Sequence, residues 1–236
     1  MNYAVTFSIL AACLIGIALQ GGVCWFALWP GISSIILTAA YAKLGPVVLG
    51  KQADGTLAWW AWVLLLPYFL LSWLTWHLLR VVRREDCCNE VVPGLWLGRR
   101  ILAHEVPNGV DLIVDLTAEF CEARQITGHK TYVCLPVLDA SVPDCAPFAT
   151  VVERVATWPG KVYIHCASGH GRSPTMMAAV LVKKQLVENV GEALQLIKQA
   201  RPGIALNKQQ RRLLDKWSQQ PPMIDSAANA DRSLSS

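Results

Sequence analysis

The sequence predicts an α/β domain, with a central mostly parallel sheet flanked by helices, preceded by an all-α transmembrane region. Two uncharged stretches predict the transmembrane region: residues 1–42 contain no Asp, Glu, Lys or Arg, and Leu57–Leu79 contains none either. Beyond them, short apolar runs alternate with segments of helical spacing, which is typical of a two-sided parallel sheet. A Cys-headed loop between a buried strand and a helix indicates where a site lies.

The first 79 residues, which we take as the transmembrane region, contain three apolar segments. Because a bilayer core requires about 20 apolar residues per helix, residues 3–19, 23–42 and 57–79 predict about three membrane-spanning helices. Seven of the ten tryptophans lie here, as in an interfacial aromatic belt, although a buried Trp-rich core helix is the alternative. The number of spans stays open, because Pro30-Gly31 would kink the second segment or make it re-entrant.

Charge next to the third segment predicts the orientation. Arg80, Arg83 and Arg84 follow it directly, whereas the N-terminus has no Lys or Arg. The positive-inside rule then predicts an integral membrane protein whose remaining part is cytoplasmic, with these arginines near anionic membrane lipids. The formal net charge of +4 is too small to indicate a nucleic-acid partner.

The rest of the chain divides by composition. Residues 80–90 form a charged juxtamembrane linker, 91–217 are long enough for one compact domain, and 218–236 predict a disordered tail rich in Ser, Ala, Asn and Asp. In the domain we expect four strands, at Leu95–Gly98, Val110–Leu116, Thr131–Leu135 and Lys161–His165. We expect five helices, over Ala118–Gln125, over Phe148–Trp158, from Ser173, from an Asn189 cap to about Ala200, and from an Asn207 cap to about Trp217.

The loop after the last strand has the chemistry of a phosphate site. Cys166 opens it and Arg172 closes it, with five residues between them. Backbone N–H groups of such a loop, together with the helix N-terminus, bind a phosphate-like dianion and stabilise a thiolate. A guanidinium grips two phosphoryl oxygens at once. The loop therefore predicts phosphoryl transfer through a cysteinyl-phosphate, with the phosphate held by Ala167, Ser168, Gly169, His170, Gly171 and Arg172.

The run His165-Cys166-x5-Arg172-Ser173 resembles the signature of the cysteine-dependent protein tyrosine phosphatase superfamily, and its surroundings are most similar to the dual-specificity branch. The resemblance covers roughly residues 91–217. It also rests on four flanking pieces, Pro93–Gly98, Val114–Thr117, Leu135–Asp139 and Arg201–Ile204, together with Asn207.

The resemblance implies further roles. Ser173 would stabilise the thiolate when it leaves the phosphoenzyme, and His165 would orient the loop. Asp139 would protonate the leaving oxygen and later deprotonate water. It lies 27 residues before Cys166, a slightly shorter interval than is usual in the family, and Asp144 on the same loop is the alternative acid. No metal or other cofactor is expected, since the covalent step replaces metal-bound water.

These observations predict a membrane-anchored hydrolase of phosphomonoesters, with dual-specificity or tyrosine protein phosphatase activity. The alternative substrate is a phospholipid such as phosphatidylglycerophosphate. Ala167 and His170 stand where phosphoinositide phosphatases tend to have lysines, which argues against a highly charged inositol phosphate. A catalytically silent phosphoprotein-binding module ranks lower, because such modules usually lack the Cys or the Arg.

Overall fold

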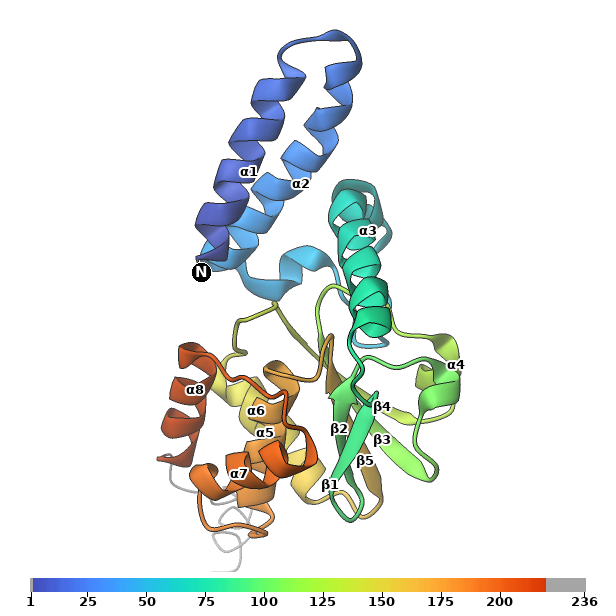
Figure 1. Cartoon of the computed structure of the whole chain (residues 1–236), viewed down its shortest axis with the longest axis vertical. Helices are drawn as coiled ribbons and strands as arrows, with labels where there is room; N and C mark the ends of the chain where they lie inside the picture. The colour runs from blue at the N-terminus through green and yellow to red at the C-terminus, as the bar shows by residue number, and fades with distance from the viewer. Residues whose placement is uncertain (1, 220–236) are drawn as a thin grey trace, which may run out of the picture.

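The computed structural model describes residues 2–219. It contains a helical N-terminal region and an α/β domain (Figure 1). A tail is predicted over residues 218–236, and its residues from 220 on lie outside the described part of the chain.

The N-terminal region begins with an antiparallel helical hairpin. Its arms are α1 (Tyr3–Ala18) and α2 (Leu28–Ala39), joined by the short helix η1 (Gly22–Ala27), and the hairpin projects away from the α/β domain (Figure 1). Two short helical turns, η2 (Ala40–Leu44) and η3 (Gly45–Leu49), follow.

The last element of this region is α3 (Trp59–Val82), which leads into the α/β domain. By length and composition, two helical stretches, Gly22–Leu49 and Trp59–Val82, are apolar enough to cross a membrane, and α1 is a shorter apolar helix. The core helices of soluble proteins can have the same length and composition, so it is the contacts of these helices that distinguish a membrane span from a core helix.

The domain contains one five-stranded sheet in the order β1-β2-β5-β3-β4. Strand β1 pairs with β2 antiparallel, and the other pairs are parallel, as the predicted fold class requires. All four predicted strands are present, as β2 (Leu95–Arg99), β3 (Val110–Thr117), β4 (Thr131–Val137) and β5 (Lys161–Cys166). The edge strand β1 (Cys88–Val92) was not predicted, because its first residues are polar and resemble a linker.

Four helices cover one face of the sheet (Figure 1). They are α5 (Cys145–Ala156), α6 (Arg172–Lys183), α7 (Val190–Ala200) and α8 (Lys208–Ser218). The six residues Met176–Leu181 of α6 are all buried, which makes α6 the central helix of the core. The two predicted N-caps are confirmed: Asn189 accepts from the N–H of Glu192 at 3.0 Å, and Asn207 accepts from the N–H of Gln210 at 2.9 Å.

The helix predicted over Ala118–Gln125 is wrong. Only α4 (Arg124–Thr127) is helical there; with the short η4 (Ala103–Glu105), it completes the helices of the domain. The preceding residues form a loop in which glutamate side chains accept the backbone hydrogen bonds: Glu119 from the N–H of Ala118, and Glu122 from the N–H of Ala123. Both glutamates are buried, because they have partners inside the domain.

Candidate active site

The predicted phosphate loop connects β5 to α6. Cys166 is the last residue of β5 and is buried. Its Sγ lies 3.3 Å from the backbone nitrogen of Gly169 and 3.3 Å from the Oγ of Ser173. The N–H of Gly169 donates to the sulfur, and either atom of the Cys166–Ser173 pair can be the donor. Ser173 is therefore in contact with the side chain on which its predicted role depends.

The conformation of the loop depends on Gly169. Its φ is +77°, and a Cβ atom there would lie 2.5 Å from the carbonyl carbon of Gly98 in β2. A side chain would thus be both strained and obstructed. The missing side chain lets the loop pack directly on the neighbouring strand.

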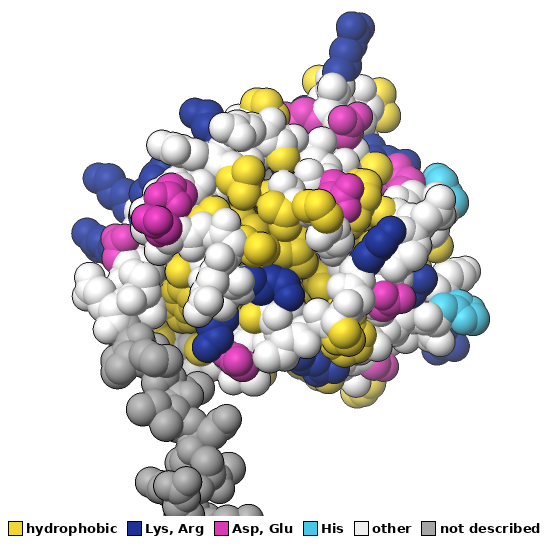
Figure 2. All heavy atoms as spheres, turned by 90° about the horizontal axis from the view of Figure 1, so that it is seen from below, with side chains coloured by type: hydrophobic (Ala, Val, Ile, Leu, Met, Phe, Trp, Pro, Cys, Tyr) yellow, Lys and Arg dark blue, Asp and Glu magenta, His cyan; other side chains and the backbone are white. Residues whose placement is uncertain are grey.

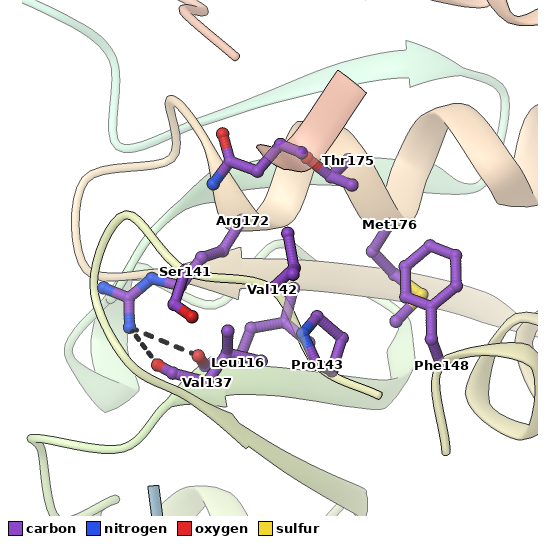
Figure 3. Close-up of a pocket in the computed structure, with 10 residues that line it drawn as sticks. Leu116, Val137, Ser141, Val142, Pro143, Phe148, Arg172, Thr175 and Met176 are labelled. Carbon is purple, nitrogen blue, oxygen red and sulfur yellow. Dashed lines mark hydrogen bonds between the residues drawn. The ribbon is translucent and has the colours of Figure 1, made fainter. Parts of the chain in front are cut away.

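The side chain of Arg172 is buried and held on several sides. Its two terminal nitrogens donate to the two carboxylate oxygens of Glu119, at 3.0 and 2.7 Å. Nη1 also donates to the carbonyls of Val137, at 2.7 Å, and Leu116, at 3.4 Å (Figure 3). Burial opposes the charge, but Glu119 holds the pKa of the guanidinium above its ordinary value. Among the described residues Nε is buried and has no hydrogen-bond partner.

Figure 3 shows the surroundings of Arg172. The side chain borders a small cavity lined by α6 and by the segment after β4, with Val142, Pro143, Phe148 and Met176 as its apolar wall. This packing fixes the aliphatic part of Arg172, so that the guanidinium is oriented before any ligand binds.

The two candidate acids differ in position. The Oδ1 of Asp139 lies 3.2 Å from Nη2 of Arg172, and its side chain is 60% exposed. Asp144 is exposed and occupies the N-cap position of α5. The structure therefore brings Asp139 to the guanidinium that would hold the phosphate, while Asp144 begins a helix.

A buried polar network lies behind the nucleophile. His165, next to Cys166, has its Nε2 at 3.6 Å from Glu122 and its Nδ1 at 3.9 Å from Asp115. Asp115 also accepts hydrogen bonds from the hydroxyls of Tyr132, at 2.6 Å, and Thr117, at 2.7 Å. Both carboxylates lie beyond hydrogen-bond distance of the imidazole, and among the described residues Nδ1 of His165 has no hydrogen-bond partner.

One cation of this network, Lys51, comes from outside the phosphatase-like sequence, whereas Arg100, which lies 3.7 Å from Glu122, comes from within it. Lys51, in the segment between η3 and α3, donates to Asp115 at 2.8 Å and to the carbonyl of Phe120. Both side chains of the Lys51–Asp115 pair are 0% exposed. Burial alone would raise the pKa of Asp115, but Lys51 holds it well below its usual range. The same segment makes a second contact, since Gly55 accepts a hydrogen bond from the N–H of Glu122 at 2.8 Å.

Asp115, Glu122 and His165 could also be considered as metal ligands. Their ligand atoms lie within 4.8 Å of one another, and all three residues are buried. The ammonium of Lys51 already supplies a positive charge to this group.

A second arginine, Arg201, holds the loop from its outer side. Its Nε donates to the carbonyl of Gly169 at 3.1 Å, and its Nη2 donates to the carbonyl of Ser168 at 3.2 Å. Its Nη1 donates to the side chain of Asn89 in β1 at 2.8 Å. The loop residue His170 contacts the segment after α3, through Glu85 at 2.6 Å.

Sequence reasoning missed four residues of the site: Lys51, Asp115, Glu119 and Glu122. Asp115 lies in the predicted strand Val110–Leu116, Glu119 and Glu122 lie in the segment that we interpreted as a helix, and Lys51 lies in the predicted loop before the third span. Their roles follow from pairings between distant parts of the chain.

Comparison with known proteins identifies this arrangement. The family described as "Dual specificity phosphatase, catalytic domain" matches residues 98–220, more than half of the chain. The chain belongs to the dual-specificity phosphatase family. Its catalytic domain is thus of the tyrosine and dual-specificity phosphatase type, a class of phosphoric monoester hydrolases.

Individual relatives of this phosphatase are distant. It is 28% identical to dual specificity protein phosphatase 1-B of Xenopus laevis over 126 residues, covering 50% of this chain and 33% of that protein. It is 29% identical to dual specificity protein phosphatase 4 of Homo sapiens over 128 residues, covering 50% of this chain and 31% of that protein. The chain spans about a third of the length of these curated relatives. The crystal structure of Tk-PTP in the active form matches with a TM-score of 0.52 and 21% identity, covering 57% of this chain and 98% of that one, which shows the shared fold.

The buried lysine leads to a test of stability. Lys51→Met should lower the free energy of unfolding by about 3–5 kcal/mol, because Asp115 would remain buried without its partner. Urea unfolding of the detergent-solubilised chain measures this change. The exposed Lys43 of the same region supplies the control, since Lys43→Met should change stability by less than about 0.5 kcal/mol. Equal effects of the two changes would show that the buried pair contributes nothing specific.

Proposed function

We propose that this chain hydrolyses phosphomonoesters through a cysteinyl-phosphate intermediate. The Cys166 thiolate attacks phosphorus, the ester P–O bond breaks, and Asp139 gives its proton to the leaving oxygen. Water then attacks the phosphocysteine while Asp139 takes back a proton, and inorganic phosphate and the thiolate are released. The observation that carries this proposal is the contact of the Cys166 sulfur with the N–H of Gly169 and the hydroxyl of Ser173, beside Arg172, whose Nε has no hydrogen-bond partner among the described residues.

The other loop residues would stabilise the transition state. The amides of residues 167–171 and the guanidinium of Arg172 would hold the equatorial oxygens of the transferring phosphoryl group. Ser173 would donate to the sulfur as it leaves, which its distance of 3.3 Å supports. His165 would act as a positioning residue through its contacts with Glu122 and Asp115.

Phosphorylated tyrosine, serine or threonine in proteins is the substrate class we propose first, on the basis of the family to which the chain belongs. A phospholipid headgroup is the second candidate. One observation favours it: a cleft of about 740 Å³ next to the Asp139 loop is lined by Tyr3 and Tyr41 of the N-terminal region and by Ser141 and Asn207 of the domain. The apolar helices would anchor the chain in a membrane, with the catalytic domain in the cytoplasm.

Variants of Cys166 and Arg172 give the first test of the proposed function. Phosphate release from para-nitrophenyl phosphate should vanish in Cys166→Ser. In Arg172→Lys, kcat should fall by about 10²–10³-fold, since lysine can neither pair with both oxygens of Glu119 nor replace the Nε donor. Arg154→Lys, at an exposed position of α5, is the matched control and should leave kcat unchanged. Normal turnover in Cys166→Ser would exclude the covalent mechanism.

The identity of the acid gives the second test. Asp139→Asn should lower kcat by about 10²–10⁴-fold, because the leaving oxygen would have no proton donor. Asp144→Asn should have a small effect, since Asp144 occupies the start of α5. The comparison of kcat for the two variants decides between them, and the reverse order would assign the acid to Asp144.

The substrate class gives the third test. Phosphate release by the full chain in lipid vesicles should be compared for a phosphotyrosine peptide, a phosphothreonine peptide and phosphatidylglycerophosphate. We expect peptide hydrolysis to exceed lipid hydrolysis, and each activity should be absent in Cys166→Ser. Faster release from phosphatidylglycerophosphate would favour the phospholipid candidate.

A further inference from the structure

Both ends of helix α3 are held near the catalytic domain, the first through the segment before the helix and the last by direct contact. Just before its first residue, the N–H of Ala58 donates to the carbonyl of Gly50, which adjoins the buried Lys51. Near its last turn, Arg80 forms an ion pair with Glu105 at 2.8 Å. The ring of Trp76 lies 6.2 Å from that of Phe120.

The middle of α3 also packs on the catalytic domain. Leu65 and Phe69 are buried in one cluster with Ala118 and Leu138, which adjoin Glu119 and the candidate acid Asp139. A helix of 24 residues is about 36 Å long, and a spanning helix places its ends on opposite sides of a hydrocarbon core about 30 Å thick. A folded domain on one side of a bilayer cannot contact both ends of such a helix.

The segments that flank the hairpin lie on the same side. Lys51 follows η3 and is buried in an ion pair with Asp115, which places the end of the hairpin segment against the sheet. At the other end, Asn2 and Tyr3 line the cleft that Asn207 borders from the catalytic domain. The hairpin therefore leaves the catalytic domain and returns to it (Figure 1).

The outward surface of these helices is apolar. Along α3 the exposed residues include Trp59, Val63, Leu70, Leu74 and Leu78, and at the hairpin tip they include Leu19, Val23 and Phe26, which are 79%, 81% and 83% exposed. By contrast, the opposite end of the molecule shows charged side chains of both signs over its surface (Figure 2). A projecting uncharged hairpin, beside a Trp-rich helix that ends in arginines, has the chemistry of a lipid bilayer contact.

We propose that the N-terminal region is a one-sided membrane insert. The α1–α2 hairpin enters the bilayer from the side of the catalytic domain and returns to that side. Helix α3 lies in the membrane interface, between lipid and catalytic domain, instead of forming the third span predicted over residues 57–79. The Asp139 loop then lies at the level of the lipid headgroups. This inference rests on the proposed membrane anchoring, but it does not depend on catalysis.

The proposal predicts that the segment around Lys51 lies on the same side of the membrane as the catalytic domain, which can be tested by labelling. The native cysteines would be replaced by serine, and a single cysteine would be introduced at the exposed position Ala53 or Lys198. Each variant would then be treated with a membrane-impermeant maleimide in sealed right-side-out vesicles and in inverted vesicles. Ala53→Cys should label in the same vesicles as Lys198→Cys, which marks the catalytic domain. Labelling in opposite vesicles would show that α3 crosses the membrane, and recovery of the chain without lipid would also overturn the proposal.

Two further measurements cover the case in which the serine-substituted chain fails to fold. In the native sequence, reporters fused to the N-terminus and to the C-terminus should give signals from the same side, whereas three spans would give opposite sides. In addition, bimane attached at Val63→Cys, Leu70→Cys or Leu78→Cys, three similarly exposed positions along α3, should be quenched to the same degree by lipids brominated at one depth. Strongest quenching at Leu70 by deeply brominated lipid would instead indicate a spanning helix.

Discussion

The buried ion pair between Lys51 and Asp115 joins the two parts of this molecule. It connects the segment before α3 with the carboxyl end of β3, and Asp115 in turn lies beside the imidazole that precedes the nucleophile. A buried ion pair of this kind contributes little net stability compared with apolar packing, but it is costly to break. Any displacement of the N-terminal region from this place would therefore leave Asp115 or Lys51 buried without its partner.

The same principle governs the phosphate clamp. Arg172 is buried, and Glu119 binds both of its terminal nitrogens, so the guanidinium does not have to be ordered when a substrate arrives. Preorganised charge of this kind stabilises a transition state without reorganisation of the site. Glu119 also reduces the net positive charge around Arg172.

The sequence was informative where local rules decide structure. The capping asparagines 189 and 207, the apolar strands and the Cys-x5-Arg loop all follow from short-range patterns, and the structure contains each of them. The failure at Ala118–Gln125 has a tertiary cause, because the glutamates of this segment bond to the backbone and to distant cations in place of forming a helix. Likewise, nothing local indicates that Lys51 pairs with a residue 64 positions away.

The contacts of Arg201 have a consequence for the electrical polarity of the loop. A trans peptide unit is flat, and its carbonyl and N–H point in opposite directions. The carbonyl of Ser168 accepts from Arg201 at 3.2 Å, and the N–H of the same peptide unit, that of Gly169, lies against the sulfur of Cys166 at 3.3 Å. The cation of Arg201 therefore holds this peptide unit with its N–H end, the positive end of its dipole, toward the sulfur of Cys166.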